Sequence, residues 1–352
     1  MRTHVMELVS GDQLKSDTFN QAGLHVLAKG TRIRNEEIAL LIRQSIDYVD
    51  IEPRQISIDG SSEEEQSFAH SFSQRLRDNF EFTIQAYQSV FLEALTNGKI
   101  NQDSIEEKFL SLLEVVDERK DVVSLLLSLG REDVNLYNHS LQVGLLSFYI
   151  AIWLGYSREE SYEVSKAGYL HDIGKSKVRQ SIRNHPEDLS LEELDELKRH
   201  TSYGYELIRK SLNDEALALA ALQHHELEDG SGYPLGIGKG EIHPYAQIVA
   251  VANAYIERTS SRSGEPKPGL LTILKEIHEL GFGKLNEKPV QALTRNLLPN
   301  FIGKNAKLST GETATIVYNN PTDIFRPLVK VGEEFRDLSK ERDISIEEIF
   351  IQ

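Results

Sequence analysis

The chain has 352 residues, of which 39% are hydrophobic and 27% charged, a composition typical of a soluble globular protein with two or three domains. The formal net charge is −16 at pH 7, which argues against long DNA or RNA as a partner, since proteins that bind those polymers are usually basic. The sequence contains no cysteine, and this excludes disulfides, thiolate metal ligands, cysteine nucleophiles and iron–sulfur clusters.

Neither a targeting segment nor a membrane span is expected from the sequence. The N-terminus lacks the apolar segment of a signal peptide. The longest mostly apolar run, residues 143–156, is too short to cross a bilayer and is interrupted by Gly144 and Ser147. We therefore predict a cytoplasmic protein without a membrane partner.

Residues 1–58 are expected to form a small β-rich module. Segments rich in β-branched and apolar residues predict three strands, at 5–9, 23–28 and 48–51. A polar, glycine-containing stretch follows, after which the pattern is helical as far as residue 129, with recurring Phe and Leu. We predict a helical connector over residues 59–129.

Residues 130–300 are expected to form a helical domain. Ser190 and Glu193 form a capping box, the pattern that opens a helix. Apolar residues at helical spacing predict two more helices toward the end of the domain, at 270–280 and 290–298.

The tail, residues 301–352, changes from helical to strand periodicity. Alternating or β-branched segments between turn residues predict three strands, at 306–308, 313–318 and 328–331. The predicted fold class is therefore mainly α, with an all-α core and small β-rich modules at the N- and C-terminal ends.

Histidines concentrate in the helical domain, where six of the eleven fall between residues 139 and 225. Two segments place imidazole beside carboxylate: His171-Asp172-Ile-Gly-Lys175, and His224-His225-Glu226 followed by Asp229-Gly-Ser-Gly-Tyr-Pro234. This ligand mixture suits iron, manganese, zinc or nickel. Adjacent residues on a helix do not share a face, so paired histidines favour a helix end, and Gly174 and Gly230 fit helix termination. The pattern predicts a metal site that handles a phosphate, whereas His185, which precedes a proline in a polar loop, is interpreted as a surface residue.

With His139 and His200 added, these motifs resemble the HD-GYP family, a branch of the HD-domain metal-dependent phosphohydrolases. The resemblance covers roughly residues 130–300 and implies an HD-type helical bundle. The family is associated with hydrolysis of the bacterial second messenger cyclic di-GMP. The β-rich N-terminal module also resembles one that precedes this domain in some members.

The resemblance implies two divalent metal ions, iron or manganese, with Asp172 bridging them. The first ion would be held by His139, His171, Asp172 and Asn253, and the second by Asp172, His200, His224 and His225. Asp172 and Lys175 would be the catalytic residues. The cyclic dinucleotide would be contacted by Lys175, Arg262 and Tyr233, the last at the rim of the site.

The sequence departs from the family in the segment that follows Ile248. Asn253 stands where the family has aspartate, and Tyr255-Ile256-Glu257 replaces the usual Phe-Asp-Ala. Glu265 stands where the family has a lysine after the arginine. Asn135 replaces the glutamate with which some members bind a third metal, so at most two are expected. An amide oxygen can ligate a metal but brings no charge, and the first metal is therefore expected to bind more weakly.

Three functions remain open from the sequence. The first is a metal-dependent phosphodiesterase acting on cyclic di-GMP or a related cyclic dinucleotide in bacterial signalling. The second is a catalytically degenerate domain that binds a nucleotide and signals to a protein partner through the GYP loop, residues Gly230–Pro234, or through the N-terminal module. The third is hydrolysis of another phosphate ester, since the metal ligands do not determine which nucleobase the substrate carries. The apolar helices also allow a homodimer.

Overall fold

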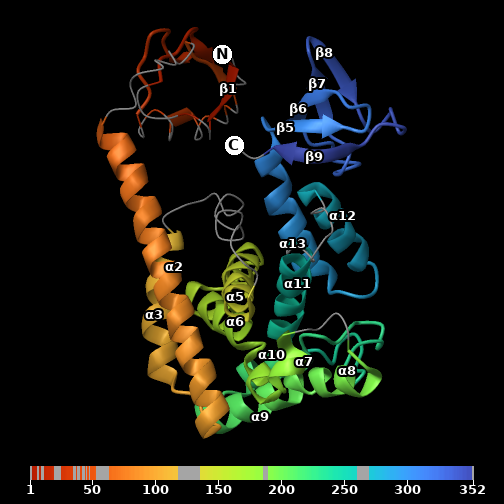
Figure 1. Cartoon of the computed structure of the whole chain (residues 1–352). Helices are drawn as coiled ribbons and strands as arrows, with labels where there is room; N and C mark the ends of the chain where they lie inside the picture. Colours follow the sequence, from red (N-terminus) through yellow and green to blue (C-terminus); the bar gives the residue numbers. More distant parts are fainter. Residues whose placement is uncertain are drawn as a thin grey trace. The chain divides into compact units, whose positions relative to one another are not determined.

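The computed structural model describes residues 2–5, 8, 12–19, 25–34, 37, 40–41, 44, 46, 48–52, 63–117, 135–184, 189–259 and 269–350 (Figure 1). The chain divides into two compact units, Met1–Ser73 and Gln74–Gln352. Helix α2, Glu63–Asn97, crosses the boundary between them. The four-part division expected from the sequence stays a prediction.

The larger unit is a helical core followed by a small sheet. Its helices after α2 are α3 (Gln102–Asp117), α5 (Leu136–Trp153), α6 (Arg158–Leu170), η2 (Ile173–Lys177), α7 (Gln180–Asn184), α8 (Leu191–Lys198), α9 (His200–Leu212), α10 (Glu215–Gln223), α11 (Pro244–Thr259), α12 (Leu270–Leu280), α13 (Glu287–Leu297) and η3 (Leu298–Phe301). The mainly α fold class is confirmed, as is the capping box of Ser190 and Glu193 at the start of α8. Within the described residues, no helix combines the length and apolar character that crossing a membrane requires.

Helices α5 and α6 form the centre of the core and approach each other through two glycines. A Cβ added at Gly168 would lie 3.0 Å from the Gly144 Cα and 2.7 Å from the Ser147 Oγ. Ser165 Oγ donates a hydrogen bond of 2.8 Å to the Gly144 carbonyl across the contact. This close approach sets the position of the C-terminal end of α6, where the first metal-binding motif begins.

A cluster of aromatic side chains joins α2 and α3 to this pair. The ring of Tyr87 meets that of Tyr169 edge to face at 4.7 Å, and Phe109 stacks on the same tyrosine at 4.4 Å. Tyr169 Oη is buried and donates to the Thr83 carbonyl at 3.0 Å, so its polar end is satisfied. Tyr87 and Phe109, two aromatics of the predicted connector, are therefore core residues of the larger unit.

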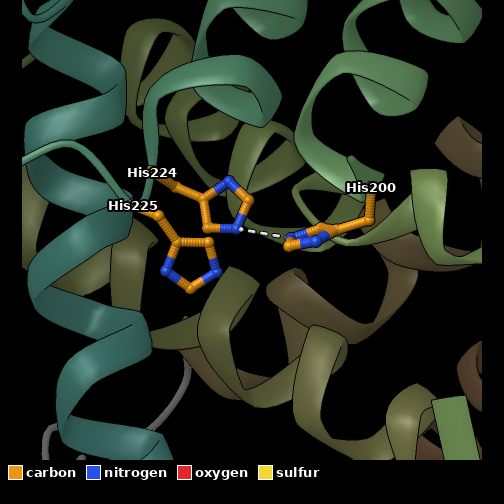
Figure 2. Close-up of side chains that lie close together, drawn as sticks. All are labelled: His200, His224 and His225. Atoms are coloured by element: carbon orange, nitrogen blue, oxygen red, sulfur yellow. Dashed lines mark hydrogen bonds between the residues drawn. The ribbon is translucent and has the colours of Figure 1, made fainter. Parts of the chain in front are cut away.

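His171 and the His224-His225 pair lie at helix ends, as the sequence analysis predicted, and His200 begins a helix. His171 is the C-cap of α6, His224 is the C-cap of α10, and His200 is the first residue of α9. Figure 2 shows His200 facing His224 and His225 across the space between these ends. Because the helices stop there, side chains from different helices can meet in one place.

The chain ends in a five-stranded antiparallel sheet with strand order β8-β7-β6-β5-β9. The strands are β5 (Asn305–Leu308), β6 (Thr313–Tyr318), β7 (Leu328–Val331), β8 (Glu334–Asp337) and β9 (Ile346–Phe350). The first three confirm the predicted strands. The sequence analysis missed β8 and β9, the two edge strands, in which charged residues obscure the strand pattern.

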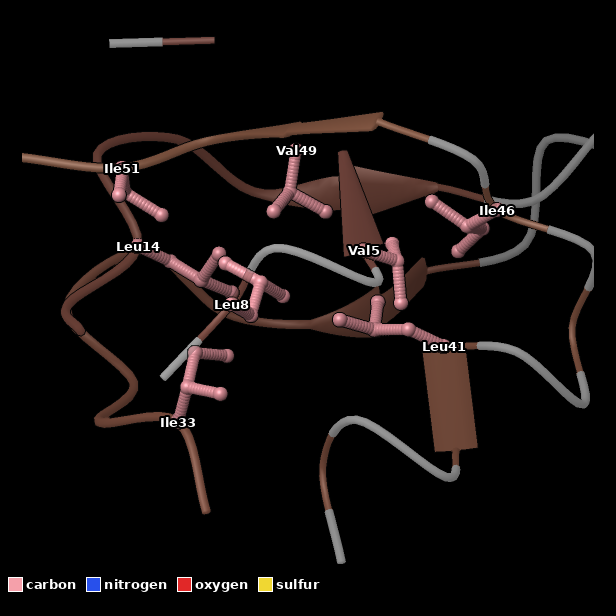
Figure 3. Close-up of a cluster of buried hydrophobic side chains, with 8 residues drawn as sticks. All are labelled: Val5, Leu8, Leu14, Ile33, Leu41, Ile46, Val49 and Ile51. Atoms are coloured by element: carbon pink, nitrogen blue, oxygen red, sulfur yellow. The ribbon is translucent and has the colours of Figure 1, made fainter. Parts of the chain in front are cut away.

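The smaller unit is β-rich, as predicted. It contains two antiparallel pairs, β1 (Arg2–His4) with β4 (Tyr48–Asp50) and β2 (Thr18–Phe19) with β3 (His25–Leu27). Its core consists of eight buried aliphatic side chains, Val5, Leu8, Leu14, Ile33, Leu41, Ile46, Val49 and Ile51 (Figure 3). Strand β1 ends at His4, before the strand predicted at 5–9, and Val5 is buried in the core; residues 6, 7 and 9 of that prediction lie outside the described residues.

Replacing Gly174 tests how tightly η2 must approach α9. A Cβ there would lie 1.9 Å from the His200 carbonyl oxygen and 2.4 Å from the Gly204 nitrogen, so backbone would have to move. We expect Gly174→Ala to lower the free energy of unfolding by about 1–3 kcal/mol, measured by urea denaturation. Gly204→Ala is the control, because its Cβ would lie 3.2 Å from the Ala221 Cβ and no nearer than 3.5 Å to the Gly174 backbone, so no backbone would have to move. Equal losses in the two variants would contradict this account.

Candidate metal centre

The carboxylate of Asp172 lies at the centre of the site, directly after the C-cap of α6, and only 1% of the residue is exposed. Its Oδ2 faces one pair of histidines, with the Nε2 of His171 at 3.4 Å and that of His139 at 3.9 Å. Its Oδ1 faces another pair, with the Nε2 of His200 at 3.3 Å and that of His224 at 3.9 Å. The two oxygens of one buried carboxylate therefore point toward two separate imidazole groups.

Three of these histidines have their rings fixed in the same way by their own helix. Each Nδ1 donates to the carbonyl three residues earlier: His171 to Gly168 at 2.7 Å, His200 to Leu197 at 2.7 Å and His224 to Ala221 at 2.8 Å. A carbonyl oxygen only accepts, so in the neutral ring the proton is on Nδ1 and the lone pair is on Nε2. A ligand histidine is typically held in this way, with one nitrogen bonded to the protein and the other free for the metal.

The arrangement of these lone pairs fits a divalent cation. The Nε2 atoms of His200 and His224 are 3.3 Å apart (Figure 2), and two lone pairs at that distance repel unless a positive charge lies nearby. In the described part of the chain, His171 Nε2 and Asp172 Oδ1 are buried without a hydrogen-bond partner. Such buried, unsatisfied acceptors are costly unless something else binds them. Two candidate ligand groups result, one of His139, His171 and Asp172 and one of His200, His224 and His225.

Burial keeps the imidazoles neutral. It lowers the pKa of His139 to about 3 and that of His200 to about 4, and it holds the pKa of His224 and His225 well below their ordinary value. Burial alone would raise the pKa of Asp172. The ammonium of Lys175 and the neighbouring histidines outweigh it, and the pKa of this carboxyl lies well below its usual range. Neutral imidazole and ionised carboxylate are the forms that bind metal.

Lys175 lies next to Asp172 and forms an ion pair with it. Its Nζ is 2.5 Å from Asp172 Oδ2, three residues away, and its side chain is 23% exposed. The ammonium is therefore both paired with the buried carboxylate and within reach of a bound ligand.

Asn253, on α11, joins the first group. Its Oδ1 accepts a hydrogen bond of 2.9 Å from His139 Nε2, and its Nδ2 donates to Glu257 Oε1 at 3.1 Å. Asn253, the residue that departs from the family pattern, is therefore in direct contact with His139, a predicted metal ligand.

The GYP loop covers the second group. A Cβ added at Gly232 would lie 2.5 Å from the Glu226 Cα, so only glycine allows the loop to fold back this closely. The Leu235 N–H donates to the buried Glu226 carboxylate at 2.6 Å, which ties the loop to the end of the histidine pair. The sequence analysis gave Glu226 no role, although a carboxylate directly after two paired histidines was the signal.

Tyr233 lies against the second group. Its ring stacks on His225 at 4.6 Å with an interplanar angle of 21°, and Lys198 Nζ lies 5.4 Å from the ring centre. The structure therefore brings together Tyr233, Lys175 and the seven predicted ligands. Arg262, Glu265 and His185 lie outside the described residues.

Comparisons with known proteins agree with this geometry. Residues 122–279 match the HD domain family. A cyclic di-GMP phosphodiesterase from Thermotoga maritima is 35% identical over 204 residues, which are 56% of this chain and 54% of that protein. The matched region is an HD domain, and its motifs are those of the HD-GYP family. HD domains of this type are metal-dependent, and the two histidine groups are the candidate sites.

One further relative and one solved structure also match this chain. The cyclic di-GMP phosphodiesterase response regulator RpfG from Xanthomonas campestris is 36% identical over 167 residues, 45% of this chain and 43% of that one. The solved structure of Bd1817, a HDG"Y"P protein from Bdellovibrio bacteriovorus, matches the fold with a TM-score of 0.51 at 18% identity, covering 83% of this chain and 97% of that one. The chain spans about half the length of the curated relatives it matches.

The bridging position of Asp172 predicts the effect of removing it. Asp172→Ala should abolish tight binding of Mn²⁺, because it removes the buried carboxylate that faces both histidine groups and with it the negative charge that would compensate the cation. Metal content after dialysis, measured by elemental analysis, checks this. His278→Ala, a histidine outside both groups, is the control and should keep the wild-type metal content. Full occupancy in Asp172→Ala would refute the assignment.

The low pKa values predict how the metal-free protein responds to acid. The pKa of His200 is about 4 in the folded chain and about 6.5 when unfolded, so below pH 6.5 the unfolded state binds more protons. The stabilising effect of the neutral ring is complete above pH 6.5 and is lost as the pH falls from 6.5 toward 4. We expect the unfolding free energy to fall over that range, and to fall less steeply in His200→Gln. If the unfolding free energy depends on pH in the same way in the wild type and in His200→Gln, burial of the neutral His200 ring is not the cause.

Proposed function

We propose that this protein is a metal-dependent phosphodiesterase that hydrolyses cyclic di-GMP or a related cyclic dinucleotide. The observation that carries the proposal is the position of Asp172, whose two oxygens face two different histidine groups. The names of the relatives from Thermotoga maritima and Xanthomonas campestris supply the substrate class. Two divalent ions, iron or manganese, would be held by the seven residues named from the sequence.

Two bound metals would supply a hydroxide at neutral pH and neutralise charge on the phosphate. The chain's own residues then determine orientation. Lys175 can leave Asp172 for a phosphate oxygen, because its ammonium is partly exposed beside that carboxylate. Glu226 and Gly232 hold the GYP loop over His225, and Tyr233 packs against the His225 ring and fixes it. Arg262 is proposed as a second phosphate contact on the resemblance alone.

One observation favours a second function, a nucleotide-binding signalling module without catalysis. In the first group, His139 Nε2 and Asn253 Oδ1 are bonded to each other, so both proposed ligand atoms are engaged within the protein. A first metal must break this bond, and the neutral amide offers no charge in return. If the first metal does not bind, the second group alone could still bind the phosphate of a ligand.

Turnover decides between the two functions. The protein should be purified without oxygen, supplied with Mn²⁺ or Fe²⁺, and incubated with cyclic di-GMP, with product formation followed by chromatography. Linear product formation that is lost in Asp172→Ala supports the phosphodiesterase. Tight binding of intact cyclic di-GMP without product would support the signalling module. The absence of both binding and turnover would refute both functions.

Lys175 provides a test of ligand contact separate from metal binding. Lys175→Ala should weaken cyclic di-GMP binding by about tenfold or more, as expected for a lost charge-assisted hydrogen bond, and leave metal content unchanged. Calorimetric titration and elemental analysis measure the two effects. Lys177→Ala is the matched control, an exposed lysine two residues further along that does not face Asp172. Loss of metal with unchanged ligand affinity would show that Lys175 has another role.

The wider biology stays a set of predictions from the sequence. These are a cytoplasmic location, a homodimer, and a protein partner that binds through the GYP loop or the N-terminal module.

A further inference from the structure

Asn253 and Glu257 lie on one face of α11, and the bond between them determines which way the Asn253 amide points. The residues are four apart, so their side chains are neighbours on the helix. The Asn253 Nδ2 donates to Glu257 Oε1 at 3.1 Å. An ionised carboxylate can only accept a hydrogen bond, so the NH₂ end of the amide must face Glu257.

The oxygen end of the amide therefore faces His139. The distance from Asn253 Oδ1 to His139 Nε2 is 2.9 Å, and an amide oxygen only accepts. In the metal-free chain the neutral His139 ring must then carry its proton on Nε2. With the amide turned over, the site would meet an NH₂ group, which cannot ligate a cation.

The negative charge of Glu257 also acts on the site electrostatically. Burial, followed by the negative charges of Asp172 and Glu257, raises the pKa of Tyr233 in the GYP loop. A negative charge hydrogen-bonded to the NH₂ end of an amide polarises the amide and makes its oxygen a better ligand for a cation. Glu257 itself is exposed, whereas Asn253 is only 4% exposed, so the carboxylate acts from the rim on a buried amide.

We propose that Glu257 is a positioning residue that holds the Asn253 amide with its oxygen toward His139. Two departures from the family pattern then act as a pair, because Glu257 orients the neutral amide that stands in place of a metal-binding aspartate. This inference deepens the proposed function and rests on it for the metal itself. The orientation, however, can be tested without any metal.

The first test reads the tautomer of His139 in metal-free protein by ¹⁵N NMR with labelled histidine. His139→Gln assigns the signal by its disappearance. The wild type should carry the proton on Nε2. In Glu257→Lys the ammonium donates to the amide oxygen, the amide turns over, and the His139 proton should move to Nδ1. Glu279→Lys, which makes the same charge change at an exposed side chain of α12, should leave the tautomer on Nε2.

Two results of this test would overturn the proposal. One is a wild-type His139 with its proton on Nδ1, since the amide oxygen would then have nothing to accept from that ring. The other is an unchanged tautomer in Glu257→Lys, since the carboxylate would then not determine the orientation.

The second test is a double-mutant cycle on Mn²⁺ affinity, measured from free Mn²⁺ by electron paramagnetic resonance. Glu257→Lys should weaken the weaker-bound Mn²⁺ by about tenfold in the wild-type background. In the Asn253→Asp background the two carboxylate oxygens are equivalent and orientation no longer matters. The loss should shrink there to about two- to threefold, the size of an exposed charge effect. Equal losses in the two backgrounds would show a charge effect alone and overturn the proposal.

The two tests separate this inference from the proposed function. A moved tautomer and unequal metal losses, in a protein without phosphodiesterase activity, would keep the role of Glu257 and reject catalysis. Active enzyme with an unchanged tautomer would keep catalysis and reject the role of Glu257.

Discussion

A buried carboxylate requires compensation, and the compensation of Asp172 organises the helical core. The side chain is nearly inaccessible to water, so its charge must be met by groups that the fold brings to it. Those groups arrive from the ends of α6, α9 and α10 and from the first turn of α5, together with the ammonium of Lys175. The ends of these helices therefore meet around the Asp172 carboxylate.

Glycine makes the convergence geometrically feasible. Gly168 lets α6 approach α5, Gly174 lets η2 approach α9, and Gly232 lets the GYP loop close over the histidine pair. At each position a single methyl group would meet backbone atoms at 3.0 Å or less. Each glycine adds conformational entropy to the unfolded chain, and that cost is offset only because the side chains of the site come together.

The features readable from the sequence were those that depend on local pattern. The placement of His224 and His225 at a helix end followed from the angle between adjacent residues on a helix, and Ser190 with Glu193 identified the start of α8. Strands β8 and β9 were missed because their stability comes from pairing with β7 and β5, which a local pattern does not contain. Gly174 was expected to end a helix, but its actual role is to allow a contact with α9, which is distant in sequence. The bond from Asn253 to Glu257 depends on side-chain rotamers and on which end of an amide faces which neighbour, and no spacing rule encodes that.

The bonds from Nδ1 of His171, His200 and His224 to carbonyls three residues earlier have a consequence for how this domain tolerates changes in length. Each ring is aligned by the last turn before it, so its direction is that of the helix end and not of a loop. One residue inserted into α10 would rotate everything after it by roughly 100° about the helix axis and carry His224 away from its partners. Insertions in the turn between β5 and β6, far from these ends, leave every ring direction as it is. Variation in length should therefore be concentrated in loops, whereas α6 and α10 must keep their number of residues for the histidines at their ends to stay in the metal site.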